Sequence, residues 1–143
     1  SLITDLNPEP KKISELQEET RLFINDFADS MDLHISLDFP LPTVDYFLDG
    51  HTTKQLMRIL KEAINNVTKH AHATTLNIGL SLVQKKYIHL NINDDGIGFG
   101  YGKENIFGHG LKSMEIRAQK MGAIFNLESQ IGQGTQISVV KEI

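Results

Sequence analysis

Three polar side chains of one predicted helix are spaced so that they could bind a metal ion and phosphate groups. Residues 56–71 contain Glu62, Asn66 and Lys69. At roughly 100° per residue, Asn66 lies about 40° from Glu62 on one side and Lys69 about 20° on the other. Carboxylate and amide oxygens are suitable ligands for Mg²⁺, and a lysine can hold phosphates. A solvated helix face with a Glu–Lys pair is the alternative, and Asn65, about 60° from Glu62, is less central to the stripe.

A glycine-rich loop, predicted over residues 95–109, follows a predicted strand. Asp94 and Asp95 come directly before Gly96 and Gly98. An aspartate at a strand end accepts hydrogen bonds strongly, and the exocyclic amino group of a purine is a suitable donor. Glycines allow the backbone to approach a flat base closely and to adopt positive φ. The pattern therefore indicates a purine site, with a plain surface loop as the alternative.

The end of this loop is a candidate phosphate site. Gly108, His109, Gly110 and Leu111 open a helix that we predict over residues 110–121. The free N–H groups and the positive dipole end of such a helix start attract anions. A glycine-rich start of a packing helix is the alternative. The spacings of the Rossmann and P-loop phosphate motifs are both absent, which excludes those two modes of nucleotide binding.

Two other short segments are less specific. Gly132-Gln-Gly134-Thr135 predicts a hairpin turn that leads into the last strand. His70 and His72 lack a third metal ligand nearby, so we interpret them as residues of a helix end, with His70 close to the phosphates.

The elements that position these residues follow from periodicity and from turn residues. Helices are predicted over about residues 11–31, 51–71 and 110–121, the second capped by Thr52 or Thr53 and the third ended by Gly122. The first helix has an apolar stripe of Ile13, Leu16, Thr20, Phe23, Ile24, Phe27 and Met31. Strands are predicted over 32–40, 74–83, 87–93, 123–129 and 135–140, with a connection over 41–50. Hairpins outnumber crossovers, which predicts an α+β fold with a mixed, mostly antiparallel sheet and helices on one face.

The composition is that of one globular domain. The chain has 143 residues, and we expect a lead-in over residues 1–10 and a domain over 11–143. A net charge of −4 argues against general binding to nucleic acid. The absence of cysteine excludes disulfides, thiolate zinc sites and cysteine catalysis, and it fits a reducing compartment. No apolar run is long enough to span a bilayer, and no signal peptide is visible.

Together, the motifs resemble the ATP-binding catalytic domain of bacterial sensor histidine kinases, within the superfamily that includes gyrase and MutL. Residues 62–71 resemble the N box of that family, and residues 94–99 its first glycine box. Residues 108–111 resemble the box at the end of the lid, and residues 132–135 the last box. The order and spacing agree over about residues 11–141. The short lid and residues 108–118 are most similar to the subfamily paired with LuxR-type response regulators.

The resemblance implies a two-layer α/β sandwich of the Bergerat type, with ATP and Mg²⁺ between the helices and a mobile lid. It implies that Asn66 ligates Mg²⁺, that Glu62 orients or activates the attacking group, and that Asp94 binds the adenine amino group. The other implied nucleotide contacts are Lys69 and His70 (phosphates), Gly96 and Gly98 (base), Gly108, His109, Gly110 and Leu111 (phosphates) and Thr135 (adenine side). Asp95 stands where many relatives have Asn.

Kinases of this family also need a phosphoacceptor histidine, usually followed by an acidic residue, on a dimerising helix pair. None of the six histidines here is followed by an acidic residue. We therefore expect the catalytic part of a protein histidine kinase, cytoplasmic and with little activity alone. It would donate the γ-phosphoryl group of ATP to a histidine of a separate dimerisation domain, which then serves a LuxR-type response regulator. We expect no direct contact with nucleic acid or membrane, and any membrane anchor of the full-length protein lies outside these residues. A serine kinase of the anti-sigma type and an inactive nucleotide-binding module remain as alternatives.

Overall fold

The main element of the computed structural model, which describes residues 8–28, 30, 32–98 and 104–143, is a five-stranded sheet. Its order is β2–β4–β5–β7–β6. The strands are β2 (His34–Asp38), β4 (Thr75–Val83), β5 (Tyr87–Asp94), β6 (Ile124–Ser129) and β7 (Thr135–Glu142). Strand β2 pairs with β4 in parallel, and every other neighbouring pair is antiparallel. The predicted mixed, mostly antiparallel sheet is confirmed.

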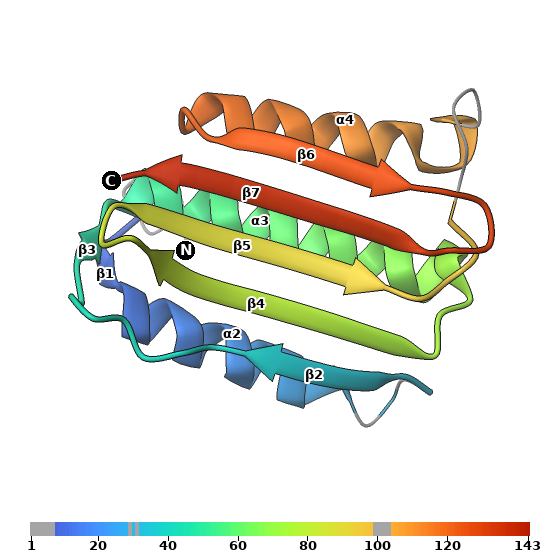
Figure 1. Cartoon of the computed structure of the whole chain (residues 1–143), viewed down its shortest axis with the longest axis horizontal. Coiled ribbons are helices and arrows are strands. Elements are labelled where there is room, and N and C mark those ends of the chain that lie inside the picture. The colour runs from blue at the N-terminus through green and yellow to red at the C-terminus, as the bar shows by residue number, and fades with distance from the viewer. Residues whose placement is uncertain (1–7, 29, 31, 99–103) are drawn as a thin grey trace.

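Three helices, α2 (Ile13–Ala28), α3 (Gly50–Asn66) and α4 (Glu104–Lys120), cover one face of this sheet (Figure 1). A short π-helix, η1 (Val67–Ala71), continues α3. Two short strands, β1 (Lys11–Lys12) and β3 (Phe47–Leu48), pair antiparallel beside the start of α2. The molecule is therefore a two-layer α/β sandwich, as the sequence predicts.

The two layers meet in one apolar core. The central strands alternate, so that one side chain of every two points toward the helices. The buried residues from the strands include Leu76, Ile78, Leu80, Ile88, Leu90 and Ile92, and those from α3 include Leu56, Ile59, Leu60 and Ala63. In α2, the predicted stripe is confirmed for Ile13, Leu16, Thr20, Phe23 and Ile24. Met31 and the side chain of Phe27 lie outside the described residues, as do residues 1–7 of the predicted lead-in.

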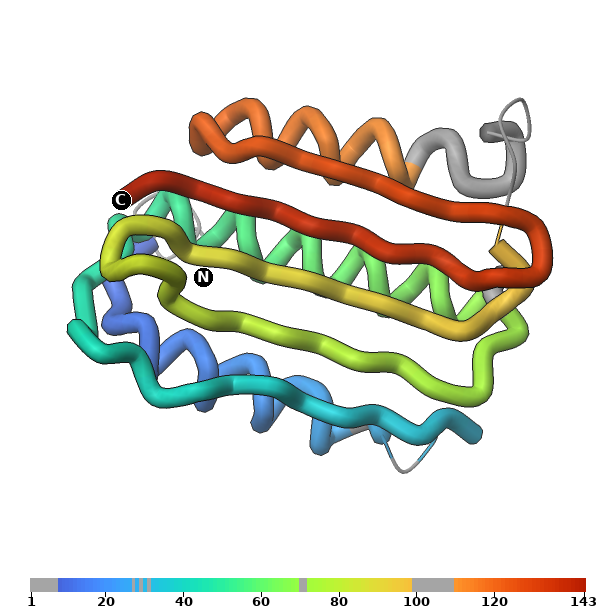
Figure 2. Tube along the Cα trace, in the orientation of Figure 1, coloured from blue at the N-terminus to red at the C-terminus, as the bar shows by residue number. Residues whose placement is uncertain are grey.

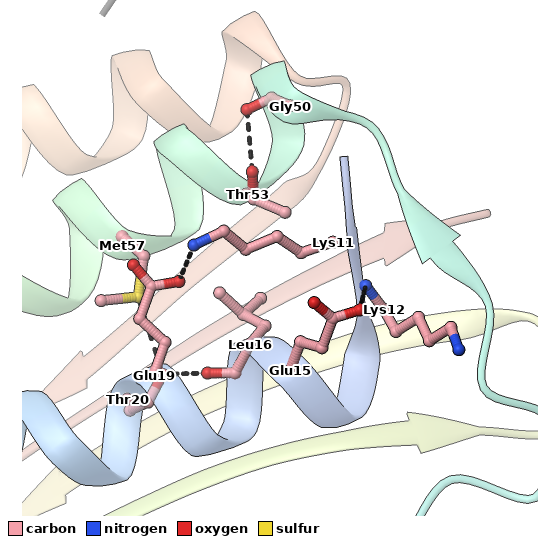
Figure 3. Close-up of polar contacts among 9 residues, drawn as sticks. All are labelled: Lys11, Lys12, Glu15, Leu16, Glu19, Thr20, Gly50, Thr53 and Met57. Atoms are coloured by element: carbon pink, nitrogen blue, oxygen red, sulfur yellow. Dashed lines mark hydrogen bonds and ion pairs between the residues drawn. The ribbon is translucent and has the colours of Figure 1, made fainter. Parts of the chain in front are cut away.

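The start of α2 differs from the prediction by two residues. Lys11 and Lys12 are extended because they pair with Leu48 and Phe47, so the helix begins at Ile13. Lys11 forms an ion pair with Glu19, eight residues later in α2 (Figure 3). The pairing partners are more than thirty residues away in sequence, which is why the local pattern did not show the strand.

The predicted cap of α3 is wrong. Asp49 is the N-cap residue, and its side chain accepts a hydrogen bond of 2.7 Å from the N–H of Thr52. Thr53 lies inside the helix, where its hydroxyl donates to the carbonyl oxygen of Gly50 at 2.9 Å (Figure 3). Thr52 and Thr53 are both buried. Aspartate at this position satisfies a backbone donor of the first turn and also places negative charge at the positive end of the helix.

We expect Asp49→Ala to lower the free energy of unfolding by about 1 kcal/mol at pH 7, the usual contribution of an N-cap. The hydrogen bond from Thr52 lowers the pKa of Asp49 below its ordinary value. A carboxylate with a lowered pKa in the folded state stabilises the protein above its unfolded pKa, about 3.9. That contribution disappears as the pH falls through the lowered value. Urea unfolding at pH 7 and at pH 3 measures this, with the exposed Asp38→Ala as control. An equal loss for Asp49→Ala and Asp38→Ala at pH 7 would contradict the assignment.

The start of α4 is the largest correction. The sequence predicts a loop up to His109 and a helix from Gly110, but the helix begins at Glu104. Residues 104–107 contain neither proline nor glycine, and the helix continues through Gly108 and Gly110 in spite of a cost of about 1 kcal/mol for each glycine. At its other end the prediction is confirmed: Gly122, with φ of 71°, follows the helix, and its N–H donates to the carbonyl oxygen of Gln119 at 3.0 Å.

Candidate functional site

The predicted site residues gather at one end of the sandwich. Strand β5 ends there, β7 and β4 begin there, and α3 reaches its last turn at the same end (Figures 1 and 2). This arrangement follows from the topology, since antiparallel neighbours place the end of one strand beside the start of the next. Asp94 is the last residue of β5 and is paired directly with Thr135, the first residue of β7.

Asp94 is a half-buried carboxylate whose position is set by its own loop. The N–H of Gly96 donates to Oδ1 of Asp94 at 2.8 Å. Burial raises the pKa of Asp94 above its ordinary value, and the charge of Asp95 adds to the rise. A carboxyl group of this kind can accept a hydrogen bond from a ligand with little competition from bulk water.

The glycines next to Asp94 are required by close contacts between backbone segments. A Cβ on Gly134, which has φ of 78°, would lie 2.0 Å from the carbonyl oxygen of Asp94. A Cβ on Gly98, which has φ of 62°, would lie 2.1 Å from the carbonyl oxygen of Gln130. The N–H of Gly132 donates to the carbonyl oxygen of Ile97 at 2.6 Å. The loop after β5 therefore packs, backbone against backbone, on the turn between β6 and β7.

Residue Thr135 has a further partner that the sequence did not indicate. The hydroxyl groups of Ser129 and Thr135 are 2.9 Å apart, and the Ser129 hydroxyl also donates to the carbonyl oxygen of Gly134 at 3.0 Å. Ser129 thus holds the turn between β6 and β7 closed beside Asp94. A serine six residues before a threonine is not a recognised sequence motif. Only the pairing of β6 with β7 shows that Ser129 lies beside Thr135.

Glu62, Asn66 and Gly110 form a second group, at the contact between α3 and α4. A Cβ on Gly110 would lie 2.7 Å from Oε1 of Glu62, 2.9 Å from Nδ2 of Asn66 and 3.0 Å from Oδ1 of Asn66. The carboxylate of Glu62 and the amide group of Asn66 therefore border the same small space, next to the bare Cα of a glycine. Leu111 is partly buried against the core, whereas Asn65 is exposed. The predicted preference for Asn66 over Asn65 agrees with these positions.

Lys69 follows Asn66 by three residues, in the π-helix η1. It is exposed on η1 and lines a hollow of about 340 Å³ with Thr68, His72 and Asp32. Neither Asn66 nor Asp94 is among the described residues that line this hollow. The wheel angle that placed Lys69 beside Glu62 assumed α-helical geometry, and a π-helix turns through a smaller angle at each residue. The role of Lys69 toward phosphates stays a prediction.

The glycine box at the lid end lies inside α4. Gly108, His109, Gly110 and Leu111 follow the first residue of the helix by four or more positions, so their N–H groups are not those of the first turn. The predicted helix start at Gly110 is therefore wrong in this structure, and contact of these four residues with phosphates stays a prediction. The side chains of His70 and His109 lie outside the described residues.

The side chains available as metal ligands limit which metal ion the site can bind. Among the described residues, no three His, Cys, Asp or Glu side chains are grouped so that they could hold a metal ion. A carboxylate beside an amide can still contribute to Mg²⁺ binding, because Mg²⁺ usually keeps several waters and is bound partly by substrate phosphates.

In the part of the chain described, no helix is both long and apolar enough to cross a membrane.

Known proteins match both the sequence and the fold. A family model described as histidine kinase-, DNA gyrase B-, and HSP90-like ATPase matches residues 51–142. Sensor histidine kinase YdfH of Bacillus subtilis (strain 168) is 31% identical over 134 residues, which cover 92% of this chain and 32% of YdfH. The nitrate/nitrite sensor protein NarQ of Escherichia coli (strain K12) is 29% identical over 126 residues, which cover 88% of this chain and 22% of NarQ. The chain thus spans a third or less of these two relatives.

The solved structure of the Acinetobacter baumannii histidine kinase AdeS superposes with a TM-score of 0.71 and 19% sequence identity. The superposition covers 94% of this chain and 66% of the AdeS chain. At that identity the likeness supports the fold, and the sandwich is the one found in histidine kinases.

Proposed function

Since the chain belongs to the family of histidine kinase-, DNA gyrase B- and HSP90-like ATPases, which implies that it binds ATP, we propose that it is the catalytic domain of a sensor histidine kinase. In this proposal it binds ATP with Mg²⁺ and donates the γ-phosphoryl group to a histidine of a separate dimerisation domain. The response regulator that then receives the phosphoryl group is of the LuxR type, an assignment that follows from the sequence resemblance.

The observation that carries the proposal is the environment of Asp94. Its carboxylate is half-buried, accepts the N–H of Gly96, and lies where two glycine-containing loops meet. In the proposed complex the other acceptor positions of Asp94 bind the amino group of adenine. Gly96 and Gly98 provide a surface without side chains for the flat base, and Thr135 lies at its edge.

Glu62 and Asn66 fit the second half of the ligand. The carboxylate of Glu62 and the amide group of Asn66 border one space beside Gly110, and both side chains are partly exposed. Asn66 would hold Mg²⁺ there. When bound, Mg²⁺ supplies neutralisation of the phosphate charge.

The proposed reaction needs positioning more than covalent chemistry. A ring nitrogen of the acceptor histidine forms a bond to the γ-phosphorus, while the bond from that phosphorus to the β–γ bridging oxygen breaks and ADP leaves. Glu62 would accept a hydrogen bond from the other ring nitrogen and so orient the ring. The acceptor histidine would arrive on the dimerisation domain, so we expect little activity without that domain.

Labelled ATP tests the proposal. The chain is mixed with the histidine-bearing domain of a relative such as YdfH, and the acid stability of the transferred label is measured. We expect an acid-labile phosphohistidine to form. An acid-stable label on an added protein would indicate a serine kinase. ATP binding without transfer to any histidine-bearing domain of the relatives would favour an inactive nucleotide-binding module.

Replacement of Asn66 with Ala is expected to weaken the binding of ATP in the presence of Mg²⁺ by about 5- to 20-fold. The reason is that water must replace one hard ligand of the ion. Titration calorimetry with and without EDTA measures the effect, which should be small once Mg²⁺ is removed. Asn65→Ala is the matched control, because Asn65 is the same residue type one position earlier and is exposed. Equal losses for both variants would contradict the role of Asn66.

A further inference from the structure

Asp95, to which the sequence resemblance assigns no role, has a carboxylate that accepts three hydrogen bonds from Thr74 and Thr75. Its Oδ1 accepts the N–H groups of Thr74 and Thr75, each at 2.8 Å. Its Oδ2 accepts the hydroxyl of Thr74 at 2.5 Å, and its own N–H donates to the carbonyl oxygen of Thr75 at 3.4 Å. These bonds join the residue after β5 to the start of β4, twenty residues earlier in the chain.

The Asp95 carboxylate is exposed, so burial does not explain this arrangement. The hydrogen bonds from Thr74 and Thr75 hold the pKa of Asp95 well below its usual range, so the group is charged at any pH at which the protein works. That negative charge also raises the pKa of the neighbouring Asp94. The two adjacent carboxylates at the end of β5 therefore repel each other.

The position of Asp95 connects it to Asp94 in a direct way. It is the single residue between Asp94 and Gly96, and the N–H of Gly96 holds Oδ1 of Asp94. Fixing the side chain of Asp95 on β4 restricts the backbone dihedral angles on both sides of it. Those dihedral angles decide whether the N–H of Gly96 points at the Asp94 carboxylate.

We propose that Asp95 is a positioning residue for purine recognition: by fastening the end of β5 to the start of β4, it holds Asp94 in the orientation that distinguishes adenine from guanine. This inference rests on the proposed function, because it concerns the ligand that Asp94 binds. Adenine carries an amino group where guanine carries a carbonyl oxygen, so a correctly oriented carboxylate favours adenine. A carboxylate that rotates freely loses part of that preference.

The test is the ratio of the dissociation constants for GTP and ATP, both with Mg²⁺, together with the melting temperature of each variant. Asp95→Ala should lower the ratio by about fivefold or more, which is less than the loss of a whole hydrogen bond to a charged group, because Asp94 keeps its carboxylate and loses only its orientation. Asp95→Asn should keep the ratio within about twofold, because the amide oxygen can accept both N–H groups and the amide nitrogen can donate to the Thr74 hydroxyl. Thr74→Val removes one of the bonds and should lie between the two.

Asp26→Ala, which removes a charge from the exposed side of α2, controls for net charge. A lower melting temperature for Asp95→Ala with an unchanged ratio would mean that Asp95 only stabilises the fold, and the inference would fail. If Asp95→Ala does not fold, an unchanged ratio in Thr74→Val overturns it. A wild-type chain that binds ATP and GTP equally would instead count against the base-binding role of Asp94, and so against the proposed function.

Discussion

Replacement of Asp94 with Asn is expected to weaken ATP binding by about 30- to 100-fold, the scale of a lost hydrogen bond to a charged group. In the structure, Oδ1 of Asp94 already accepts the N–H of Gly96. The proposed complex adds a second donor, the amino group of adenine. A carboxylate offers acceptors to both donors, whereas an amide has one oxygen and one NH₂ group. When the amide oxygen of the variant stays on the N–H of Gly96, its NH₂ group is the group that faces the adenine amino group, and two donors then oppose each other.

Titration calorimetry with ATP and GTP measures this loss, which should be much smaller for GTP. Asp95→Asn is the matched control, since it is the same change one residue further on. Burial raises the pKa of Asp94, so this group becomes protonated at a higher pH than an ordinary aspartate does. As the pH is lowered, the affinity of the wild type for ATP should therefore begin to fall at a higher pH. An Asp94→Asn variant with unchanged affinity for ATP would remove the adenine assignment.

The change Gly134→Ala is expected to lower the free energy of unfolding by about 3 kcal/mol or more and to abolish measurable ATP binding. Alanine at φ of 78° costs roughly 1–2 kcal/mol in backbone strain. Its Cβ would also lie 2.0 Å from the carbonyl oxygen of Asp94, so the turn between β6 and β7 must move away from β5. That movement disturbs the position of Asp94, the residue proposed to bind the base.

The control for this prediction is Gly132→Ala. Gly132 also has a positive φ, of 82°, but nothing lies within 4 Å of the position of its Cβ. We expect only the strain, about 1 kcal/mol, and ATP binding close to that of the wild type. Urea unfolding and calorimetry on both variants separate strain from steric overlap. Equal stability of the two variants would contradict the close approach of Gly134 to Asp94.

Periodicity and turn residues predicted the secondary structure well where the determining contacts are local. The strands around Ile78 and Leu90 alternate, and α3 carries one apolar face, so both were visible within a window of ten residues. Gly122 ends α4 for a reason that is also local, its positive φ. The strand at Lys11 was missed because its pairing partner, Leu48, lies far along the chain.

The beginning of α4 shows that local sequence patterns are also insufficient at the candidate site. Glycines before a predicted helix indicated a start at Gly110, whereas the helix extends back to Glu104. In the folded chain Gly110 lies against Glu62 and Asn66, and a Cβ there would have to displace the ends of these two side chains. The glycine is therefore explained by helix–helix contact as well as by any phosphate site, and a single sequence cannot separate these two reasons.

For this protein, the sequence by itself determined the family resemblance and the residue types of the site, because motifs such as Asp94-Asp-Gly96 depend on a few adjacent positions. Only the tertiary structure decided how those residues are held. It brought Gly134 onto the backbone of Asp94 and the carboxylate of Asp95 onto the start of β4. Both contacts join segments that are distant in sequence and meet through strand pairing, and no local pattern of residues records such a meeting.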